Sequence, residues 1–391
     1  MILIGGVAAG PALSIDSYLP AFPAIAKEFG ASPSAVQLTL TTFFVGMILG
    51  MVVAGPLSDR FGRKPPLVIG LAMLSLASLA CALAPSVEFM IGARFVQGAA
   101  AATGMALQAA VVRDIAHGAR ASRLLASLML VTMAAPIIAP LIGSNFLLLG
   151  SWRWIFVALA AYGAIWCGLV SVCIHETLPP ERQRRGSLAK HLREYKVLVR
   201  DRSLLAVGLA AGLVSGAFYV YLSGSSPVLQ GVYGVSPQAY GVLFAINAIG
   251  VALAAQSNRL ILRRRSVEQA MKLGLAVAAI AGASLVAAIA IGGLGLLGVL
   301  IPLFVIVGAC GQIYPNAIAL GMAGHPDLAG GASSLLSLMQ IGLGAALAPL
   351  AGIGGARSAL PMAIAIGALA ISAPIVFRIV GGSNERRIAG P

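Results

Sequence analysis

The sequence predicts an all-α polytopic membrane protein, with 12 transmembrane helices in two pseudo-symmetric six-helix bundles. Of its 391 residues, 59% are hydrophobic and only 10% are charged, and the mean hydropathy is +0.96. A soluble domain carries about 25% charged residues, so this chain needs lipid as its solvent. Its apolar runs, such as 204–222 and 273–291, are long and continuous. Such runs fit helices that cross a bilayer in about 20 residues, and they lack the alternation typical of a membrane β-barrel.

Apolar segments separated by short polar turns define the expected spans. They are 2–24, 36–58, 65–84, 88–112, 122–148, 153–174, 203–226, 237–260, 267–291, 294–322, 329–353 and 357–380. We expect an N-terminal bundle over 1–175, a cytoplasmic linker over 176–202, a C-terminal bundle over 203–380 and a cytoplasmic tail over 381–391. In the linker, Leu188, Leu192, Tyr195 and Val199 share one helical face. This pattern allows either a helix on the membrane surface or a solvated linker.

An internal repeat supports the division into halves. Pro23, Gly30, Ser32, Pro33 and Ala35 recur as Pro227, Gly234, Ser236, Pro237 and Ala239, and every pair is 204 residues apart, as 227 is from 23. Both copies lie at the outer end of the first hairpin of their half. Parallel repeats about an axis along the membrane normal are a known plan of transporters, with the substrate site near the midplane.

Lys and Arg gather at the turns that lie on one side of the predicted membrane. With the N-terminus inside, the outer side keeps only Lys27, Arg153 and Arg357. The positive-inside rule therefore places both termini in the cytoplasm. It also explains the net charge of +14 without a nucleic-acid partner.

No cofactor or metal is expected from the residues. The four cysteines lie in apolar segments without ligand spacing, and the four histidines form no cluster. The chain also lacks the Gly-Lys loop that binds nucleotide phosphates, so we expect neither ATP as the energy source nor enzymatic activity.

Two charged residues lie well inside predicted spans. Asp16 is the one acid among twelve in such a position, and Arg94 is the one base. A charge at that depth costs at least about 2.5–3.5 kcal/mol, so both are functional candidates. We expect Asp16 to carry protons, with Arg94 as its partner or across the same cavity. The alternative is a static buried ion pair that fixes helix packing.

The turn after the second span has the densest motif. It reads Gly55-Pro56-Leu57-Ser58-Asp59-Arg60-Phe61-Gly62-Arg63-Lys64-Pro65, which resembles the hallmark inner-loop motif of the major facilitator superfamily. Arg94-Phe95-Val96-Gln97-Gly98 resembles a fourth-span motif of the same superfamily. The segment 135–143 resembles the fifth-span antiporter motif, of which we single out Ala135, Ala139, Pro140 and Gly143, with alanines at two usual glycine positions.

The resemblance implies roles for these residues. Asp59 and Arg63 are expected to form a charge relay with Asp114, supported by Gly55 and Gly62, that latches the halves in the outward-open state. In the second half Arg263 stands where the repeat would place an acid. The latch is therefore expected on one side only.

Further strings, Ile15–Ala21, Arg113–Ile115 and Glu176–Arg182, resemble the bicyclomycin-resistance (Bcr/CflA) drug exporters. That resemblance implies a monomeric drug/proton antiporter of the bacterial inner membrane, driven by the proton gradient. Its partners would be protons, membrane lipid and small, largely apolar compounds of the bicyclomycin or chloramphenicol type. A proton-coupled transporter of a metabolite, such as a sugar, amino acid or nucleoside, is the alternative.

Polar residues inside the spans are candidates for the substrate site. A few polar groups in an apolar cavity is the usual design, although amides and tyrosines equally join helices by hydrogen bonds. The candidates are Tyr18, Gln97, Gln108, Tyr219, Tyr221, Asn247, Gln312, Tyr314 and Asn316.

Overall fold

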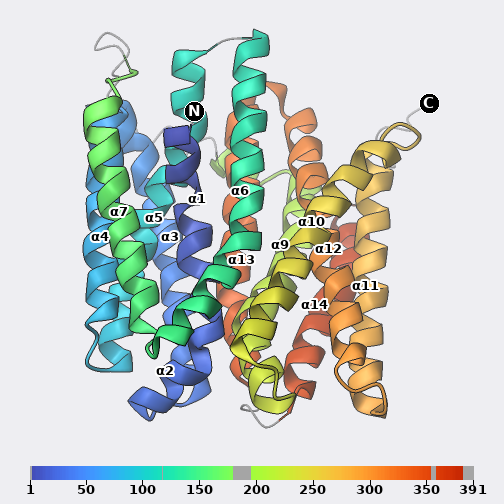
Figure 1. Cartoon of the computed structure of the whole chain (residues 1–391). Coiled ribbons are helices and arrows are strands. Elements are labelled where there is room, and N and C mark those ends of the chain that lie inside the picture. Colours follow the sequence, from blue (N-terminus) through green and yellow to red (C-terminus); the bar gives the residue numbers. More distant parts are fainter. Residues whose placement is uncertain (1, 117, 179–194, 354–357, 382–391) are drawn as a thin grey trace, which may run out of the picture. The chain divides into compact units, whose positions relative to one another are not determined.

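A computed structural model describes residues 2–116, 118–178, 195–353 and 358–381 (Figure 1). Within these ranges, eleven helices are long and apolar enough to cross a membrane. The N-terminal helix α1, Ile2–Asp16, is shorter at 15 residues and completes the predicted set of twelve spans. No strand occurs in the described ranges, so the all-α prediction is confirmed.

The remaining spans lie close to their predicted positions. They are α3 (Pro33–Phe61), α4 (Lys64–Ala82), α5 (Val87–Ile115), α6 (Gly118–Phe146), α7 (Arg153–Cys173), α9 (Arg202–Ser226), α10 (Pro237–Ile261), α11 (Val267–Ile291), α12 (Leu297–Gly324), α13 (Ala329–Leu347) and α14 (Leu360–Gly381). The surface helix suggested by Leu188, Leu192, Tyr195 and Val199 begins outside the described residues; within them, 195–198 is helical.

The first span differs from its prediction. We expected one helix over 2–24, but α1 ends at Asp16 and is followed by the 3-10 turn η1 (Leu19–Ala21) and the short helix α2 (Phe22–Phe29). Pro20 and Pro23 explain the break, because neither has an N–H to donate to the preceding turn. Asp16 is therefore the last residue of a helix, at a bend in the chain.

The sequence repeat has the same local structure in both copies. Gly30 and Gly234 adopt the left-handed conformation, with φ of 59° and 66°, which costs glycine least. The hydroxyls of Ser32 and Ser236 then accept the backbone N–H three residues on, each at 3.2 Å, and so cap α3 and α10.

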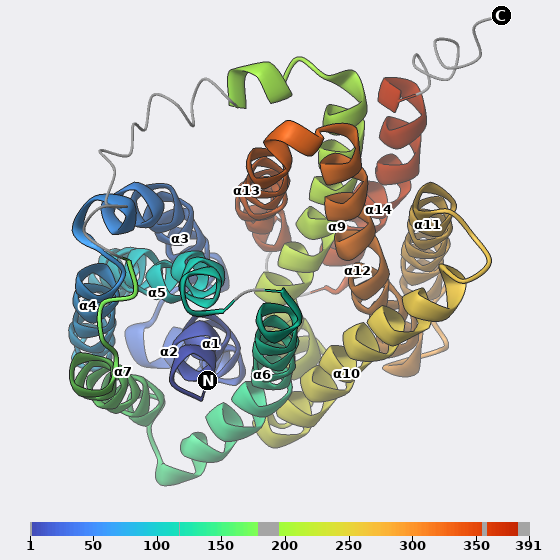
Figure 2. The ribbon, with the colours of Figure 1, turned by 90° about the horizontal axis from the view of Figure 1, so that it is seen from above.

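The chain divides into two compact units. The first comprises Met1–Leu188 with Ser236–Ala245, and the second comprises Ala189–Val235 with Ile246–Pro391. In the first unit, α5 packs on α3, α4 and α1, α4 packs on α7, and α1 packs on α6 (Figure 2). In the second unit, α9 packs on α13 and α14, and α11 packs on α12 and α14.

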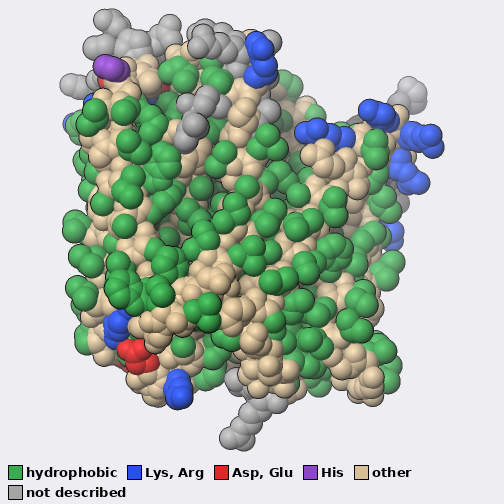
Figure 3. Space-filling model, in the orientation of Figure 1, with side chains coloured by type: hydrophobic (Ala, Val, Ile, Leu, Met, Phe, Trp, Pro, Cys, Tyr) green, Lys and Arg blue, Asp and Glu red, His purple; other side chains and the backbone are tan. Residues whose placement is uncertain are grey.

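The exposed side chains are those expected of a membrane protein. Large apolar side chains such as Leu76, Ile165 and Ile280 are more than half exposed on the sides of the helices. Figure 3 shows apolar side chains over the helix sides, with Lys and Arg near the helix ends. Hydrocarbon is the solvent that such a surface requires.

Candidate functional site

Asp16 closes α1 and is nearly buried, with 6% of its surface exposed. The turn that follows is fixed by Ser17, whose hydroxyl donates to the Leu13 carbonyl at 2.6 Å. Within the described part of the chain, no Lys, Arg or His lies at ion-pair distance from the Asp16 carboxylate. Asp16 is thus an acid held inside the first unit without a direct counter-ion.

Arg94 lies seven residues after the start of α5 and is fully buried. Its guanidinium carbon is 4.2 Å from the ring centres of both Tyr18 and Phe43, so two aromatic faces stabilise the cation. One terminal nitrogen donates to the Ser14 carbonyl at 3.0 Å and also to the side chain of Gln97. The expected side-chain pairing with Asp16 is not present in this structure. Arg94 instead binds the α1 backbone two residues before Asp16.

The ends of two helices of the first unit, α3 and α5, meet around Arg63. Its guanidinium donates to Asp59 at 2.6 Å, to the Ser58 hydroxyl at 2.6 Å and to Asp114 at 3.0 Å. Arg63 therefore joins the end of α3 to the end of α5. Burial lowers the pKa of Arg63, but hydrogen bonds to Asp114 and Asp59 outweigh that effect and raise the pKa above its ordinary value. The three residues of the predicted relay are together, and we call Asp59, Arg63 and Asp114 the Arg63 cluster.

Glu176, which sequence reasoning did not select as a site residue, completes this end of the unit. Its carboxylate accepts the backbone N–H groups of Arg63 at 2.7 Å, Lys64 at 3.1 Å and Leu178 at 2.9 Å. It thereby caps the first turn of α4, where the helix dipole favours an anion. Partial burial raises the pKa of Glu176, but the backbone N–H bonds outweigh it, and the net pKa is lowered.

The same contact explains one of the two motif glycines. Gly62 has φ of +92°, and a Cβ there would overlap the Glu176 carboxylate. Gly55 differs, because a Cβ at that position meets nothing within 4 Å. Only Gly62 is therefore required by the geometry of the turn.

The segment that resembles the antiporter motif packs α6 against α1. Ala135 and Ala139 are buried, and a Cβ on Gly143 would overlap the Ser17 carbonyl. Small residues let two helix backbones approach closely. The segment thus fixes the bend that follows Asp16.

Most of the substrate-site candidates are hydrogen-bonded within their own unit. The Tyr18 hydroxyl shares a hydrogen bond with Thr39 at 3.1 Å, and Gln97 donates to Ser78 at 2.7 Å. In the second unit, Asn247 donates to the Tyr221 hydroxyl at 2.9 Å. These contacts support the packing interpretation for those residues.

The other candidates belong to a hydrogen-bond network, pack within the second unit or, for Gln108, are half-buried. Asn316 and Gln312 belong to the network described next. Tyr219 packs against Gly344, and Tyr314 packs beside the core of the second unit. Gln108 is half-buried in α5.

A pair of amides joins α10 to α12 in the second unit. Asn316 donates to the Asn258 side-chain oxygen at 2.9 Å, and Asn258 donates back to the Asn316 oxygen at 3.2 Å. Gln312, one turn from Asn316, donates to the Ala270 carbonyl of α11 at 2.8 Å. Asn258 was missed because an amide next to Arg259 resembles an ordinary helix end, and only its partner 58 residues away shows its role.

Comparison with known proteins places the chain in a family. The model of the Major Facilitator Superfamily matches residues 2–349. The chain belongs to the major facilitator superfamily. It is 35% identical to an uncharacterized MFS-type transporter, YdgK, of Bacillus subtilis, over 98% of this chain and 95% of that protein. It is 29% identical to a bicyclomycin resistance protein homolog of Haemophilus influenzae, over 98% and 96% of the two chains.

The fold of the superfamily is found in solved structures as well. A crystal structure of a D-xylose–proton symporter aligns with a TM-score of 0.74 at 15% identity, covering 96% of this chain and 95% of that one. This likeness concerns the fold. The chain is a multi-pass membrane protein whose family and fold are those of transporters.

Proposed function

We propose that this transporter is a proton-coupled antiporter that exports small, largely apolar drug-like compounds across the bacterial inner membrane by alternating access. The observation that carries the proposal is Asp16, an acid inside the membrane with 6% of its surface exposed and no cation paired to it in the described residues. An acid in that environment is suited to binding and releasing a proton during transport.

The neighbourhood of Asp16 supports antiport. The carboxylate lies at the bend between α1 and η1, against which the Gly143 segment of α6 packs. Arg94 binds the same helix end through the Ser14 carbonyl. In the proposed cycle, Asp16 is protonated from outside and drug leaves there, and deprotonated Asp16 inside accepts drug.

The choice of substrate rests on chemistry and on the relatives. Most of the polar candidates for the substrate site are hydrogen-bonded to neighbouring helices. This leaves a largely apolar surface for a compound. A relative named for bicyclomycin resistance matches nearly the whole chain. We therefore propose bicyclomycin- and chloramphenicol-type compounds, with both chain termini in the cytoplasm as the basic turns indicate.

The test compares Asp16→Asn with Asp327→Asn, a matched change at an exposed acid in the turn before α13. In proteoliposomes with an imposed proton gradient, we expect Asp327→Asn to export labelled chloramphenicol like wild type and Asp16→Asn to lose gradient-driven export. One proton exchanged for a neutral drug also makes export sensitive to membrane potential, by about 2.3 kcal/mol per 100 mV.

Several outcomes would contradict the proposal. Full gradient-driven export by Asp16→Asn would show that Asp16 is not the proton carrier. Export of a neutral compound that does not depend on membrane potential would exclude the exchange of one proton per compound. Uptake of a sugar, amino acid or nucleoside with no drug export would favour the metabolite transporter.

A further inference from the structure

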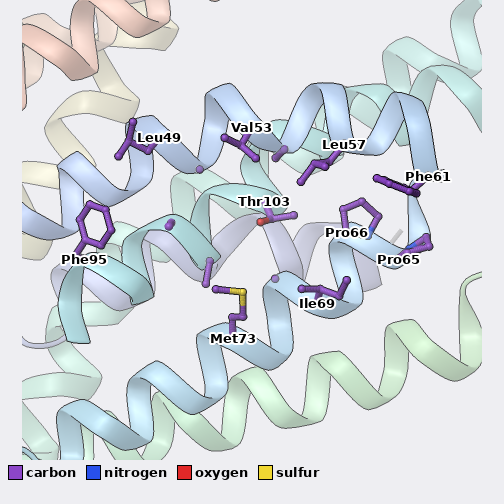
Figure 4. Close-up of a pocket in the computed structure, with 15 residues that line it drawn as sticks. Leu49, Val53, Leu57, Phe61, Pro65, Pro66, Ile69, Met73, Phe95 and Thr103 are labelled. Atoms are coloured by element: carbon purple, nitrogen blue, oxygen red, sulfur yellow. The ribbon is translucent and has the colours of Figure 1, made fainter. Parts of the chain in front are cut away.

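A groove in the first unit is not used by the proposed transport cycle. It has a volume of about 620 Å³ and lies between α3 and α4, with α5 as its floor (Figure 4). Leu49, Val53, Leu57 and Phe61 form the α3 wall, four residues apart on one helical face. Thr103 carries the one polar side-chain atom among the fifteen lining residues.

The groove exists because its floor and corners are built from small residues. Gly50, Ala54, Gly70, Ala99 and Ala100 all line it. A Cβ at Gly50 would overlap the Ala99 carbonyl, so α3 packs closely on α5 at this point. The small residues there leave the groove unfilled.

The groove opens to the surroundings of the helices. Val53 is 51% exposed, Phe61 is 54% exposed and Ile69 is 59% exposed. These walls belong to helices that are long and apolar enough to cross a membrane, so a hydrocarbon chain is an occupant that suits them. From Leu49 to Phe61 the groove is about 18 Å long at 1.5 Å per residue, close to half of a hydrocarbon core of about 30 Å. Its length therefore matches one leaflet.

Two cations stand at the mouth of the groove, beside Phe61 and Pro65. The guanidinium of Arg60 lies 5.0 Å from the ring centre of Phe61, and Lys64 directly precedes Pro65. Arg63, between them, is paired with Asp59 and Asp114. Neither Arg60 nor Lys64 forms an ion pair with an acid in the described residues.

We propose that this groove holds one acyl chain of an anionic phospholipid of the inner leaflet, with its headgroup bound by Arg60 and Lys64. An apolar trough one leaflet long suits a lipid chain, and basic residues between helix ends at the cytoplasmic surface bind anionic headgroups. A transported compound would need polar groups to orient it, and Thr103 alone is available. The bound chain would lie against the turn that carries Gly62 and Arg63, so it would also stabilise the Arg63 cluster.

The headgroup is tested by mass spectrometry of the intact purified protein in mild detergent. The probes are equal amounts of palmitoyl-oleoyl phosphatidylglycerol and phosphatidylcholine. We expect wild type to retain about tenfold more phosphatidylglycerol. The double variant Arg60→Gln, Lys64→Gln should lose this preference, and the matched variant Arg264→Gln, Arg265→Gln at exposed positions after α10 should keep it.

The chain site is tested by filling the groove. Val53→Trp, from an exposed wall position, should reduce retention of both lipids severalfold. Leu76→Trp, on α4 outside the groove and 68% exposed, should leave retention unchanged. The unfolding midpoint of each variant confirms that it is folded.

The proposal is overturned if wild type shows no preference between the lipids, or if Val53→Trp retains them as wild type does. A chloramphenicol adduct that forms in place of the lipid, and that Val53→Trp abolishes, would make the groove an entry path for transported compounds instead. Because lipid retention is measured without transport, its result is separate from the test of Asp16.

Discussion

Within each of the two units, a polar contact joins a pair of corresponding helices, and the chemistry of this contact differs between the units. In the first unit, the Arg63 cluster connects the ends of α3 and α5 through a cation and two acids. In the second unit, α10 and α12 occupy the repeated positions, and the neutral pair of Asn258 and Asn316 connects them. The corresponding helices of each unit are thus joined by polar side chains, but at different positions and with different chemistry.

The difference in chemistry follows from depth and from sequence. The Arg63 cluster lies at the helix ends, where its side chains remain partly exposed. Asn316 lies eight residues before the end of α12, about 12 Å along the helix, where a neutral amide costs less to bury than a charge. The comparison indicates that protonation and salt act on the contact in the first unit but not on its counterpart in the second.

The largest effect is expected from breaking the charged contact. Arg63→Ala removes the donor shared by Asp59 and Asp114 and leaves two acids close together. Hydrogen bonds to charged groups contribute about 1.5–3 kcal/mol each, so we expect drug export to fall at least about tenfold. Arg63→Lys should be intermediate, because an ammonium cannot reproduce the fork of donors.

Transport assays at equal protein levels measure this. The control is Arg264→Ala, an exposed cation after α10, which should retain export. An equal loss in that variant would mean that positive charge at helix ends, rather than the Arg63 geometry, is what matters.

The next effect separates the two motif glycines. Gly62→Ala forces a Cβ into the left-handed region and against Glu176, at a cost of about 1–3 kcal/mol. Gly55→Ala has free space and should change stability by no more than about 0.5 kcal/mol. Thermal unfolding of the purified variants decides this, and similar midpoints for both would contradict the role given to Gly62.

The amide pair should show a smaller, measurable coupling. Asn258→Leu leaves Asn316 with only its bond to the Gln312 carbonyl, and Asn316→Leu removes the bonds of Asn258 to Asn316, whereas the double variant removes both amides. Interhelical hydrogen bonds in membranes average about 0.6 kcal/mol, with a maximum of about 1.7, so a double-mutant cycle should give a coupling in that range. Additive single effects would show that the two side chains act independently.

The smallest effect tests the dependence on pH. Because the folded pKa of Glu176 is lowered from 4.5, its carboxylate stabilises the fold above that pH, and the contribution is lost as the pH falls through the folded value. Glu176→Gln should unfold on the order of 2 °C below wild type at pH 7. The two midpoints should converge at low pH, and a difference that persists there would exclude the charge as its cause.

Much of the fold was predictable because the membrane restricts it. Hydrocarbon demands helices of about 20 apolar residues, so the span at 267–291 was predicted with the bounds that α11 has. The break after Asp16 was missed because 2–24 is apolar apart from Asp16 and two nearby serines, and Pro20 and Pro23 count as apolar residues on a hydropathy scale. Hydropathy alone does not register a lost hydrogen-bond donor.

Contacts between segments distant in the sequence were harder to predict. The meeting of Arg63 with Asp114 was expected from a family resemblance, whereas the docking of Glu176 on the turn at Gly62 was not. Arg94 was expected to pair with Asp16 or to lie across the same cavity, because each is a lone charge inside a predicted span. In the structure the rings of Tyr18 and Phe43 stabilise Arg94 instead. This arrangement brings together α5, α3 and the turn after α1, and the sequence of one segment does not show it.

The missing side chain of Gly143 has a consequence for motion. The backbone of α6 rests directly on the Ser17 carbonyl. Residues on one helical face are three or four apart, so a slide of α6 along its axis would bring the side chain of Ala139 or Phe146 toward that carbonyl. The contact therefore opposes sliding of α6 past Ser17, and a tilt of α6 would be transmitted to the backbone that carries Asp16.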